Sequence, residues 1–194
     1  MKKVLIPLLA ALGFVTAAMG QNASFKKAYV NHTEIGLLLG NVRYVPYVGS
    51  GEMVEKRQNL TVQMFNGLQL SRRLAAGVTV GMDRYTAALV TPIMAGVRYD
   101  LTRKENARFF ASADAGYGFT WFHSDATNYH TQGGLALNPG LGLRFGKPAA
   151  TNFTLSMGYK YQQVTVDKPP FWTDTERTET RLYNRLALRL GLSF

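Results

Sequence analysis

The sequence predicts an all-β fold: an eight-stranded, antiparallel, up-and-down transmembrane β-barrel. Three observations predict it. Apolar residues recur at every second position in eight segments, glycine occupies much of the opposite phase, and the connections between segments alternate in length. A period of two is that of a β-strand, whose successive side chains point to opposite faces.

The final ten residues, RLALRLGLSF, show this period most clearly. Leucine or phenylalanine stands at every second position from Leu186 to Phe194, and arginine, alanine, glycine or serine fills the others. A terminal strand of this kind, ending on an aromatic residue, resembles the C-terminal signal of bacterial outer-membrane barrels. The resemblance implies that Leu188, Leu190, Leu192 and Phe194 form an assembly signal read by the barrel-assembly machinery.

The first twenty residues have the composition of a secretory signal peptide. Lys2 and Lys3 precede an apolar stretch over 4–15 that is too short to span a bilayer, and the small residues Ala18 and Gly20 precede Gln21. We therefore expect a signal peptide over 1–20 and a barrel domain over 21–194. A retained membrane anchor is the alternative for this segment.

Eight segments with alternating apolar residues are bounded by turn residues. They cover 32–42, 58–70, 76–84, 90–101, 108–121, 133–145, 152–164 and 180–194. The connections 71–75, 102–107 and 146–151 are short, whereas 43–57, 85–89, 122–132 and 165–179 are mostly longer. Outer-membrane barrels have short periplasmic turns and longer extracellular loops, so the long connections are expected outside the cell.

The distribution of glycine predicts which face of the barrel points inward. Glycine weakens a strand unless space is short, and an eight-stranded barrel has a narrow interior. The glycine-containing face should therefore line the lumen, and the leucine, valine and aromatic face should meet lipid. A soluble lipocalin-like barrel or a β-sandwich is the alternative. Two residues fit this pattern poorly: Pro139 predicts a bulge or the barrel rim, and Asn66 predicts a bulge or a phase shift.

Aromatic residues near the strand ends predict two interfacial girdles. The expected girdle at the long-loop end consists of Tyr44, Tyr85, Trp121 and Trp172, and that at the other end of Tyr99, Phe109, Phe145 and Phe194.

Several motifs resemble the small outer-membrane β-barrel domain family. These are ADAGYGF over 113–119, NPGLGLRF over 138–145, MGYKYQ over 157–162 and the terminal Phe194. The family includes eight-stranded barrels of the OmpA/OmpX type, and these motifs are most similar to its Bacteroidota branch. The resemblance covers essentially the whole chain after residue 20. It implies this fold and a place in the outer membrane of a Gram-negative cell, but it implies no shared catalytic residues.

Charged residues of both signs occupy the lumen phase of the predicted strands. They are Glu34, Asp83, Asp100 and Asp114 on the acidic side, and Arg98, Arg144, Lys160, Arg185 and Arg189 on the basic side. Unpaired buried charges are costly, so we expect these groups to pair. Together with Gln63, Phe65, Gln69, Met94 and Gln162 they should plug the bore. A narrow ion channel is the alternative.

The one enzyme-like cluster is WFHSDATNYH over 121–130. A lipid A deacylase has a His-x-Ser-Asn pattern, but here Ser124 directly follows His123, and adjacent strand residues point to opposite faces. His123, Asp125 and His130 are a mixed nitrogen and oxygen set of a type that binds metals. We expect a polar surface loop instead, with no catalytic, cofactor-binding or metal-binding residues.

Composition excludes several further classes of function. The chain has no cysteine, which excludes thiol nucleophiles and disulfides, and its formal net charge is +10. The basic residues are scattered and the chain is expected to be exported, so we expect contact with anionic lipid and lipopolysaccharide and none with nucleic acid. The sequence predicts a monomeric, non-enzymatic outer-membrane barrel with a structural or surface-interaction role. Its exposed loops over 45–57 and 167–177 are the candidate contact sites, and a lipid A-modifying enzyme or a small channel is the alternative.

Overall fold

A computed structural model describes residues 28–44, 53–85, 88–102, 106–125, 130–147, 150–168 and 177–194. The expected signal peptide over 1–20 lies outside these residues, as do Trp172 and the Pro169–Pro170–Phe171 segment. The side chain of Tyr44 is also outside them. Among the described residues, no helix is long and apolar enough to cross a membrane.

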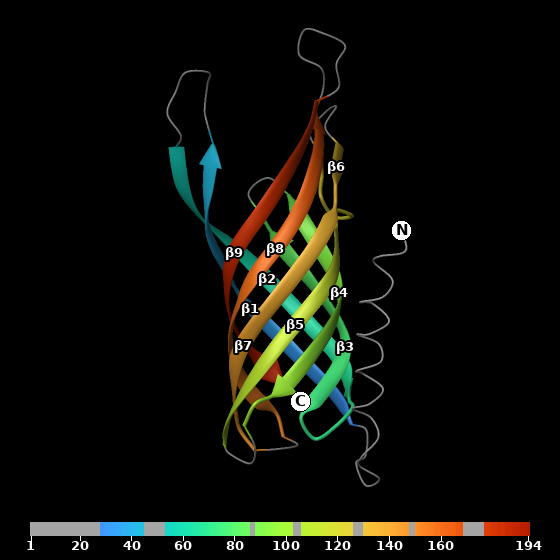
Figure 1. Ribbon diagram of the computed structural model, residues 1–194, viewed down its shortest axis with the longest axis vertical. Helices are drawn as coiled ribbons and strands as arrows, with labels where there is room; N and C mark the ends of the chain where they lie inside the picture. Colours follow the sequence, from blue (N-terminus) through green and yellow to red (C-terminus); the bar gives the residue numbers. More distant parts are fainter. Residues whose placement is uncertain are drawn as a thin grey trace, which may run out of the picture.

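Nine β-strands form one closed antiparallel sheet (Figure 1). They are β1 (Tyr29–Tyr44), β2 (Met53–Gln69), β3 (Leu74–Arg84), β4 (Leu89–Asp100), β5 (Ala107–Phe119), β6 (His130–Gln132), β7 (Gly134–Phe145), β8 (Asn152–Lys168) and β9 (Arg177–Ser193). Each long strand pairs with the next along the chain, and β9 pairs with β1 to close the barrel. The eight-stranded antiparallel barrel predicted from the sequence is confirmed.

The short β6 and the longer β7 are two segments of the same barrel strand, separated by Gly133. Both pair with β8, but His130 lies opposite Asp167 whereas Ala136 lies opposite Gln162, so the register shifts by one residue between them. A shift of this kind is a β-bulge. A Cβ at Gly133 would lie 1.8 Å from the carbonyl oxygen of Gly118, so the close approach at this bulge requires glycine.

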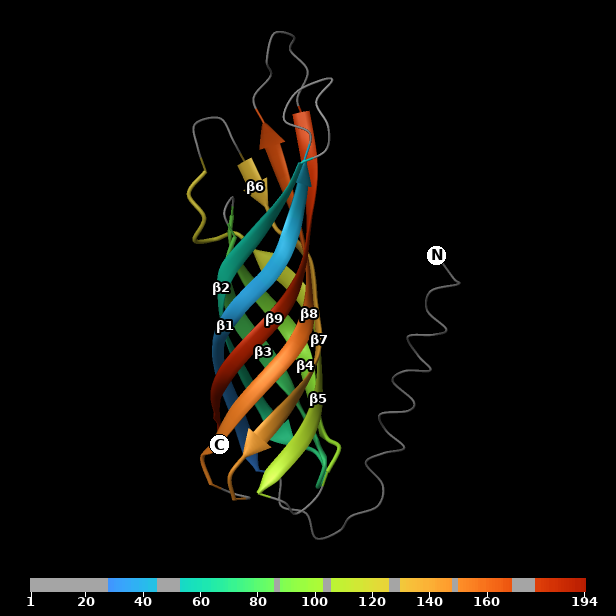
Figure 2. The ribbon, with the colours of Figure 1, turned by 90° about the vertical axis from the view of Figure 1, so that its left-hand side faces the viewer.

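Two of the long connections are shorter than the sequence suggested. β8 continues to Lys168 and β9 starts at Arg177, and the two pair from Asn152↔Ser193 to Lys168↔Arg177. β2 likewise starts at Met53 rather than near residue 58. These strands rise beyond their neighbours at the long-loop end, opposite the end where the C-terminus lies (Figure 2).

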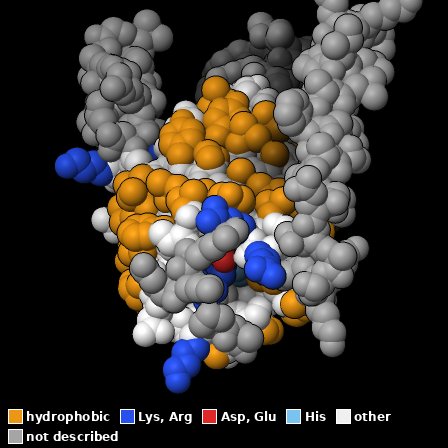
Figure 3. Space-filling view, turned by 60° about the horizontal axis from the view of Figure 1, so that its bottom comes forward, with side chains coloured by type: hydrophobic (Ala, Val, Ile, Leu, Met, Phe, Trp, Pro, Cys, Tyr) orange, Lys and Arg blue, Asp and Glu red, His pale blue; other side chains and the backbone are white. Residues whose placement is uncertain are grey.

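The outward face of the barrel is apolar and the inward face is buried. Leu186, Leu188, Leu190 and Leu192 are all exposed, while Arg185 and Arg189, in the alternate phase of the same strand, are buried. A soluble barrel has the opposite arrangement, with its apolar face in the core. Figure 3, which views the short-turn end, shows hydrophobic side chains over the barrel wall and Lys and Arg side chains at the opening.

The expected irregularities at Asn66 and Pro139 are corrected by the structure. Asn66 stays in the outward phase of an unbroken β1–β2 ladder, opposite Asn31, which donates a 2.8 Å hydrogen bond to its side chain. Pro139 lies inside β7, opposite Ala113, with no change of register. The proline interrupts the ladder to β8 without a bulge because it lacks only an N–H donor, and its ring faces outward.

Candidate functional site

The centre of the lumen is organised around the ion pair between Arg98 on β4 and Asp114 on β5. The guanidinium donates two hydrogen bonds to the carboxylate, of 2.7 and 3.2 Å. Thr79 on β3 donates a 2.7 Å hydrogen bond to the same carboxylate, and the guanidinium lies 4.3 Å from the ring centroid of Phe65. Both charges are buried, so each satisfies the other where water does not reach.

Asn138 extends this cluster across the bore. Its side-chain nitrogen donates to Asp114 at 2.9 Å, and its side-chain oxygen accepts a 3.1 Å hydrogen bond from Arg189 on β9. Gln63 lies 3.3 Å from Asn138 and donates a 2.6 Å hydrogen bond to Glu34 on β1. These contacts connect five barrel strands in one polar network.

Glu34 is also held from the other side of the barrel. The hydroxyl of Ser156 on β8 donates a 2.7 Å hydrogen bond to its carboxylate, although the two residues are 122 positions apart in the chain. Such a contact needs a closed barrel, because β8 and β1 are not neighbours in the sheet.

A second ion pair joins Lys160 on β8 to Asp83 on β3. The two charged atoms are 2.9 Å apart and both side chains are almost wholly buried. Thr61 donates a 2.6 Å hydrogen bond to the other carboxylate oxygen of Asp83. Arg185 on β9 is buried as well, with its guanidinium 5.7 Å from the ring centroid of Tyr183.

The short-turn end of the lumen holds Arg144, Asp100 and His32. Arg144 lies 3.4 Å from the carboxylate of Asp100 and donates a 2.9 Å hydrogen bond to Nε2 of His32. The ring of His32 meets the rings of Phe65 and Phe110 edge-on. All nine charged residues predicted for the lumen thus lie in it. The sequence did not single out His32, although its even-numbered position in the first strand was a signal for the inward face.

The long-loop end of the lumen holds a packed apolar cluster beside the buried Arg185. A buried cluster there consists of Leu38, Tyr85, Ala88, Val90, Val164, Val166, Tyr183 and Ala187. We call it the apolar layer. The prediction that Tyr85 belongs to the outer girdle is wrong, because Tyr85 continues the inward phase of β3 after Asp83 and stacks on Tyr183. The inward phase of Val164, at the end of the seventh predicted strand, was the available signal for this layer, whereas Val166 lies beyond that predicted strand.

The remaining girdle residues that the structure describes are on the outside. Trp121 at the long-loop end and Tyr99, Phe109, Phe145 and Phe194 at the short-turn end are all exposed.

The enzyme-like segment brings His123 and Asp125 together above the barrel wall. The N–H of Leu89 donates a 3.4 Å hydrogen bond to Nδ1 of His123, and Nε2 lies 3.4 Å from the carboxylate of Asp125. Asp125 also accepts hydrogen bonds from the hydroxyl and the backbone N–H of Thr131. Among the described residues, no group of three or more potential ligands is close enough to hold a metal ion.

Burial opposes ionisation of Asp125, but the hydrogen bonds from Thr131 outweigh it. Together with the nearby His123 and His130, they hold the pKa of the Asp125 carboxyl below its ordinary value. This carboxylate therefore holds Thr131 of β6 by charge-assisted hydrogen bonds and lies beside His123.

The expected assembly-signal residues lie on the outside of the closing strand. Leu188, Leu190, Leu192 and Phe194 are exposed, and the backbone of Phe194 exchanges two hydrogen bonds with Asn31 of β1, of 2.8 and 3.0 Å. The C-terminal residue therefore completes the seam between the first and last strands.

Comparison with solved structures shows similar barrels at very low sequence identity. The outer membrane protein OprG from Pseudomonas aeruginosa has a TM-score of 0.54 and 10% identity over 85% of this chain and 93% of that chain. The outer membrane protein AlkL in lipid bilayers has a TM-score of 0.49 and 14% identity over 91% and 96% of the two chains. Neisserial surface protein A has a TM-score of 0.44 and 11% identity over 87% and 97%.

No protein-family model and no curated protein sequence matches the chain. The likeness to OprG at this identity concerns the fold alone. Taken with the closed sheet, the apolar outer face and the charged lumen, it leads to one conclusion: the chain folds as an eight-stranded antiparallel transmembrane β-barrel, similar to small outer-membrane barrel proteins.

Proposed function

We propose that this protein is a non-enzymatic barrel of the outer membrane with a plugged lumen, acting structurally or through surface contacts of its long-loop end. The observation that carries the proposal is the filling of the lumen in two successive parts. The Arg98–Asp114 network occupies its centre, and the apolar layer around Tyr85 and Tyr183 covers its long-loop end. An ion would have to break buried charge pairs and then displace the packed side chains of the apolar layer, and both steps are costly.

The proposed surroundings follow from the outer face. An apolar wall with exposed aromatic residues near its ends suits a bilayer containing lipopolysaccharide. The resemblance to OmpA/OmpX-type barrels of the Bacteroidota branch supports the same placement in a Gram-negative cell. We further propose export through a signal peptide over 1–20, insertion by the assembly machinery through the strand ending at Phe194, and a monomeric barrel.

Single-channel recording tests the plugged lumen against the small-channel alternative. The barrel refolded without residues 1–20 is reconstituted in a planar bilayer, with a sixteen-stranded porin as the positive control. We expect no steady conductance in the nanosiemens range. Steady openings of that size from the barrel would overturn the plugged lumen.

Loop replacement tests the surface role. Residues 45–52 and, separately, 169–176 are replaced by a Gly/Ser segment of equal length, and cells are scored for envelope integrity and for adhesion to host cells. Loss of adhesion after one replacement, with the barrel still assembled, would assign the surface role to that loop. If neither replacement changes adhesion, and removal of the whole barrel alters envelope integrity, the role is structural.

The arrangement around His123 supports the non-enzymatic part of the proposal. Nδ1 accepts a hydrogen bond from the Leu89 N–H and Nε2 lies beside Asp125, and among the described residues neither nitrogen is hydrogen-bonded to the exposed Ser124. Incubation of the purified barrel with lipid A, followed by mass spectrometry, should leave the acyl chains unchanged. A gain or loss of an acyl chain would support the lipid A-modifying alternative.

A further inference from the structure

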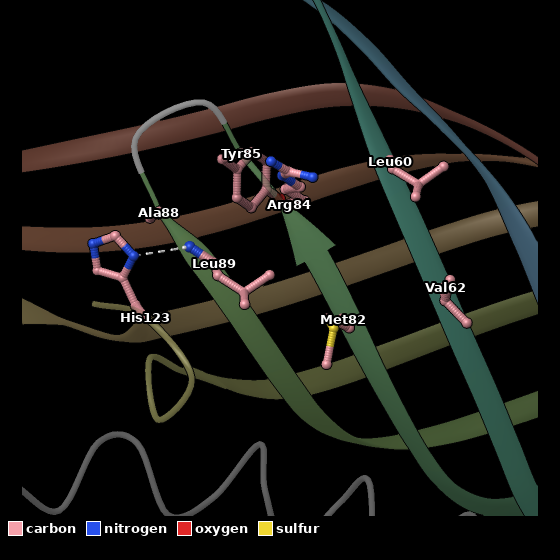
Figure 4. A pocket seen from close by; sticks show the side chains of 8 residues that line it. All are labelled: Leu60, Val62, Met82, Arg84, Tyr85, Ala88, Leu89 and His123. Atoms are coloured by element: carbon pink, nitrogen blue, oxygen red, sulfur yellow. Dashed lines mark hydrogen bonds between the residues drawn. The ribbon is translucent and has the colours of Figure 1, made fainter. Parts of the chain in front are cut away.

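A pocket of about 550 Å³ opens on the outer wall of the barrel near the long-loop end (Figure 4). It is lined by Leu60, Val62, Met82, Arg84, Tyr85, Ala88, Leu89 and His123. Leu60, Val62 and Met82 are 40–48% exposed and belong to the lipid-facing side of β2 and β3. The volume is in the usual range for pockets that bind small ligands. The pocket is therefore hollowed into the face of the barrel that contacts lipid.

The pocket lies where the outer wall changes from apolar to polar. Along β2 the outward residues from Met64 to Leu60 are apolar, and the next two, Gln58 and Lys56, are polar and exposed. Along β3 the same change occurs between Met82 and Arg84, and Arg84 is the register partner of Leu60. This boundary is the level at which lipid headgroups meet a barrel wall.

Arg84 places a positive charge at this boundary. Its side chain is exposed, and it forms no hydrogen bond or ion pair with any residue in the described part of the chain. His123, which also lines the pocket, accepts a hydrogen bond from the Leu89 N–H at Nδ1, and its Nε2 lies beside Asp125, so Arg84 is the exposed cation of the lining. A guanidinium binds phosphate through two parallel hydrogen bonds, which a neutral headgroup cannot accept as strongly.

We propose that this pocket is a binding site for one phosphorylated lipid of the surrounding leaflet, with lipid A as its occupant. An acyl chain lies along Leu60, Val62 and Met82, and a phosphate group binds Arg84. The proposal rests on the outer-membrane location proposed above and goes beyond it, because it assigns a defined site to one lipid molecule rather than general contact with the bilayer.

Native mass spectrometry of the detergent-solubilised barrel tests the site. The probes are bisphosphorylated lipid A, the same lipid after removal of both phosphates, and inorganic phosphate. We expect one bisphosphorylated lipid A per barrel, about tenfold weaker retention of the dephosphorylated lipid, and no retention of inorganic phosphate, because the apolar and charged parts act together. Equal retention of the two lipids would overturn the role of the phosphate.

Three variants at the site and two matched controls locate it on the barrel. Arg84→Gln should weaken lipid A binding about tenfold, and Arg84→Lys should retain most of it. Val62→Trp fills the pocket while keeping the wall apolar, and should also weaken binding. The matched controls are Arg72→Gln, at an exposed arginine of the opposite end, and Val78→Trp, lower on the outward face of β3. Neither should change binding.

Heat-modifiable migration in gels confirms that each variant is folded before binding is measured. If Arg84→Gln binds lipid A as the unchanged barrel does, or if Arg72→Gln weakens binding equally, the site is wrong. The proposed outer-membrane location is tested separately by fractionation of cells. If that location is wrong, the barrel will be absent from the outer-membrane fraction.

Discussion

The rings of Tyr85 and Tyr183 stack with their centroids 4.2 Å apart, which joins the β3–β4 connection to β9 at the long-loop end of the lumen. Both rings are buried in the apolar layer. The contact links residues almost one hundred positions apart, and it lies on the path that any solute would take through the barrel. It therefore bears on both the stability of the barrel and its permeability.

Truncation of this stack should destabilise and open the barrel. Tyr183→Ala removes a buried aromatic ring, and we expect the free energy of unfolding to fall by about 3–5 kcal/mol. Urea-induced unfolding in lipid vesicles measures this loss, and planar-bilayer recording should show conductance above that of the unchanged protein. Tyr85→Phe is the control, since the Tyr85 hydroxyl is buried with no hydrogen-bond partner among the described residues. That variant should be neutral or slightly stabilising, and a large loss of stability would contradict this view of the stack.

Substitutions of Arg98 and Asp114 should have strongly non-additive effects on the free energy of unfolding. Arg98→Leu or Asp114→Leu alone leaves one buried charge without its partner, and we expect each to cost about 3–5 kcal/mol. The double variant removes both charges, so it should be less destabilised than the sum of the two single variants. A double-mutant cycle by urea unfolding measures the coupling. Additive losses would mean that the two charges are satisfied independently.

Two lumen glycines should differ sharply in their tolerance of a methyl group. A Cβ at Gly36 would lie 2.0 Å from the carbonyl oxygen of Leu188, so backbone would have to move. At Gly81 the nearest atom is 3.1 Å away, and small shifts suffice. We expect Gly36→Ala to cost about 1–3 kcal/mol or more, and Gly81→Ala clearly less. Unfolding curves of the two variants under identical conditions make the comparison, and equal losses would contradict a crowding effect specific to Gly36.

The contact between Asp125 and Thr131 should depend on pH. The pKa of Asp125 is lowered in the folded protein from an ordinary value of 3.8, so its contribution to stability is fully present above that value. The contribution is lost as pH falls through the lower folded pKa. Hydrogen exchange of the Thr131 backbone N–H, which donates to Asp125, should therefore accelerate in strong acid beyond the intrinsic pH effect. Asp125→Asn should abolish this additional acceleration of exchange in acid. If the acceleration persists in that variant, another group causes it.

Alternation along each strand made the inside and outside of the barrel predictable. The leucines that lead to Phe194 are exposed and the arginines between them are buried, as the period of two requires. The same rule, applied to every inward position, would have found His32, Val164 and the inward phase of Tyr85. Tyr85 was instead assigned to a girdle because aromatic residues near strand ends are common there.

Strand ends and ladder irregularities were less predictable. β8 and β9 extend by several residues into segments without clear alternation, because backbone pairing between the two strands continues there regardless of side-chain pattern. Asn66 keeps the regular register because Asn31 donates a hydrogen bond to its side chain. Pro139 keeps it because β5 continues to pair with β7 opposite the proline. A single residue that disfavours a strand is outweighed by the ladders on either side.

The sequence by itself determined the fold class, the number of barrel strands and which phase of each predicted strand faces the lumen, because side-chain alternation is a local property of each strand. Only the tertiary structure decided which lumen groups meet: that Glu34 accepts from Ser156, that Arg189 reaches Asn138, and that Tyr85 stacks on Tyr183. These partners come from strands far apart in the chain. Their contacts depend on the register of every ladder around the closed barrel, which no single segment encodes.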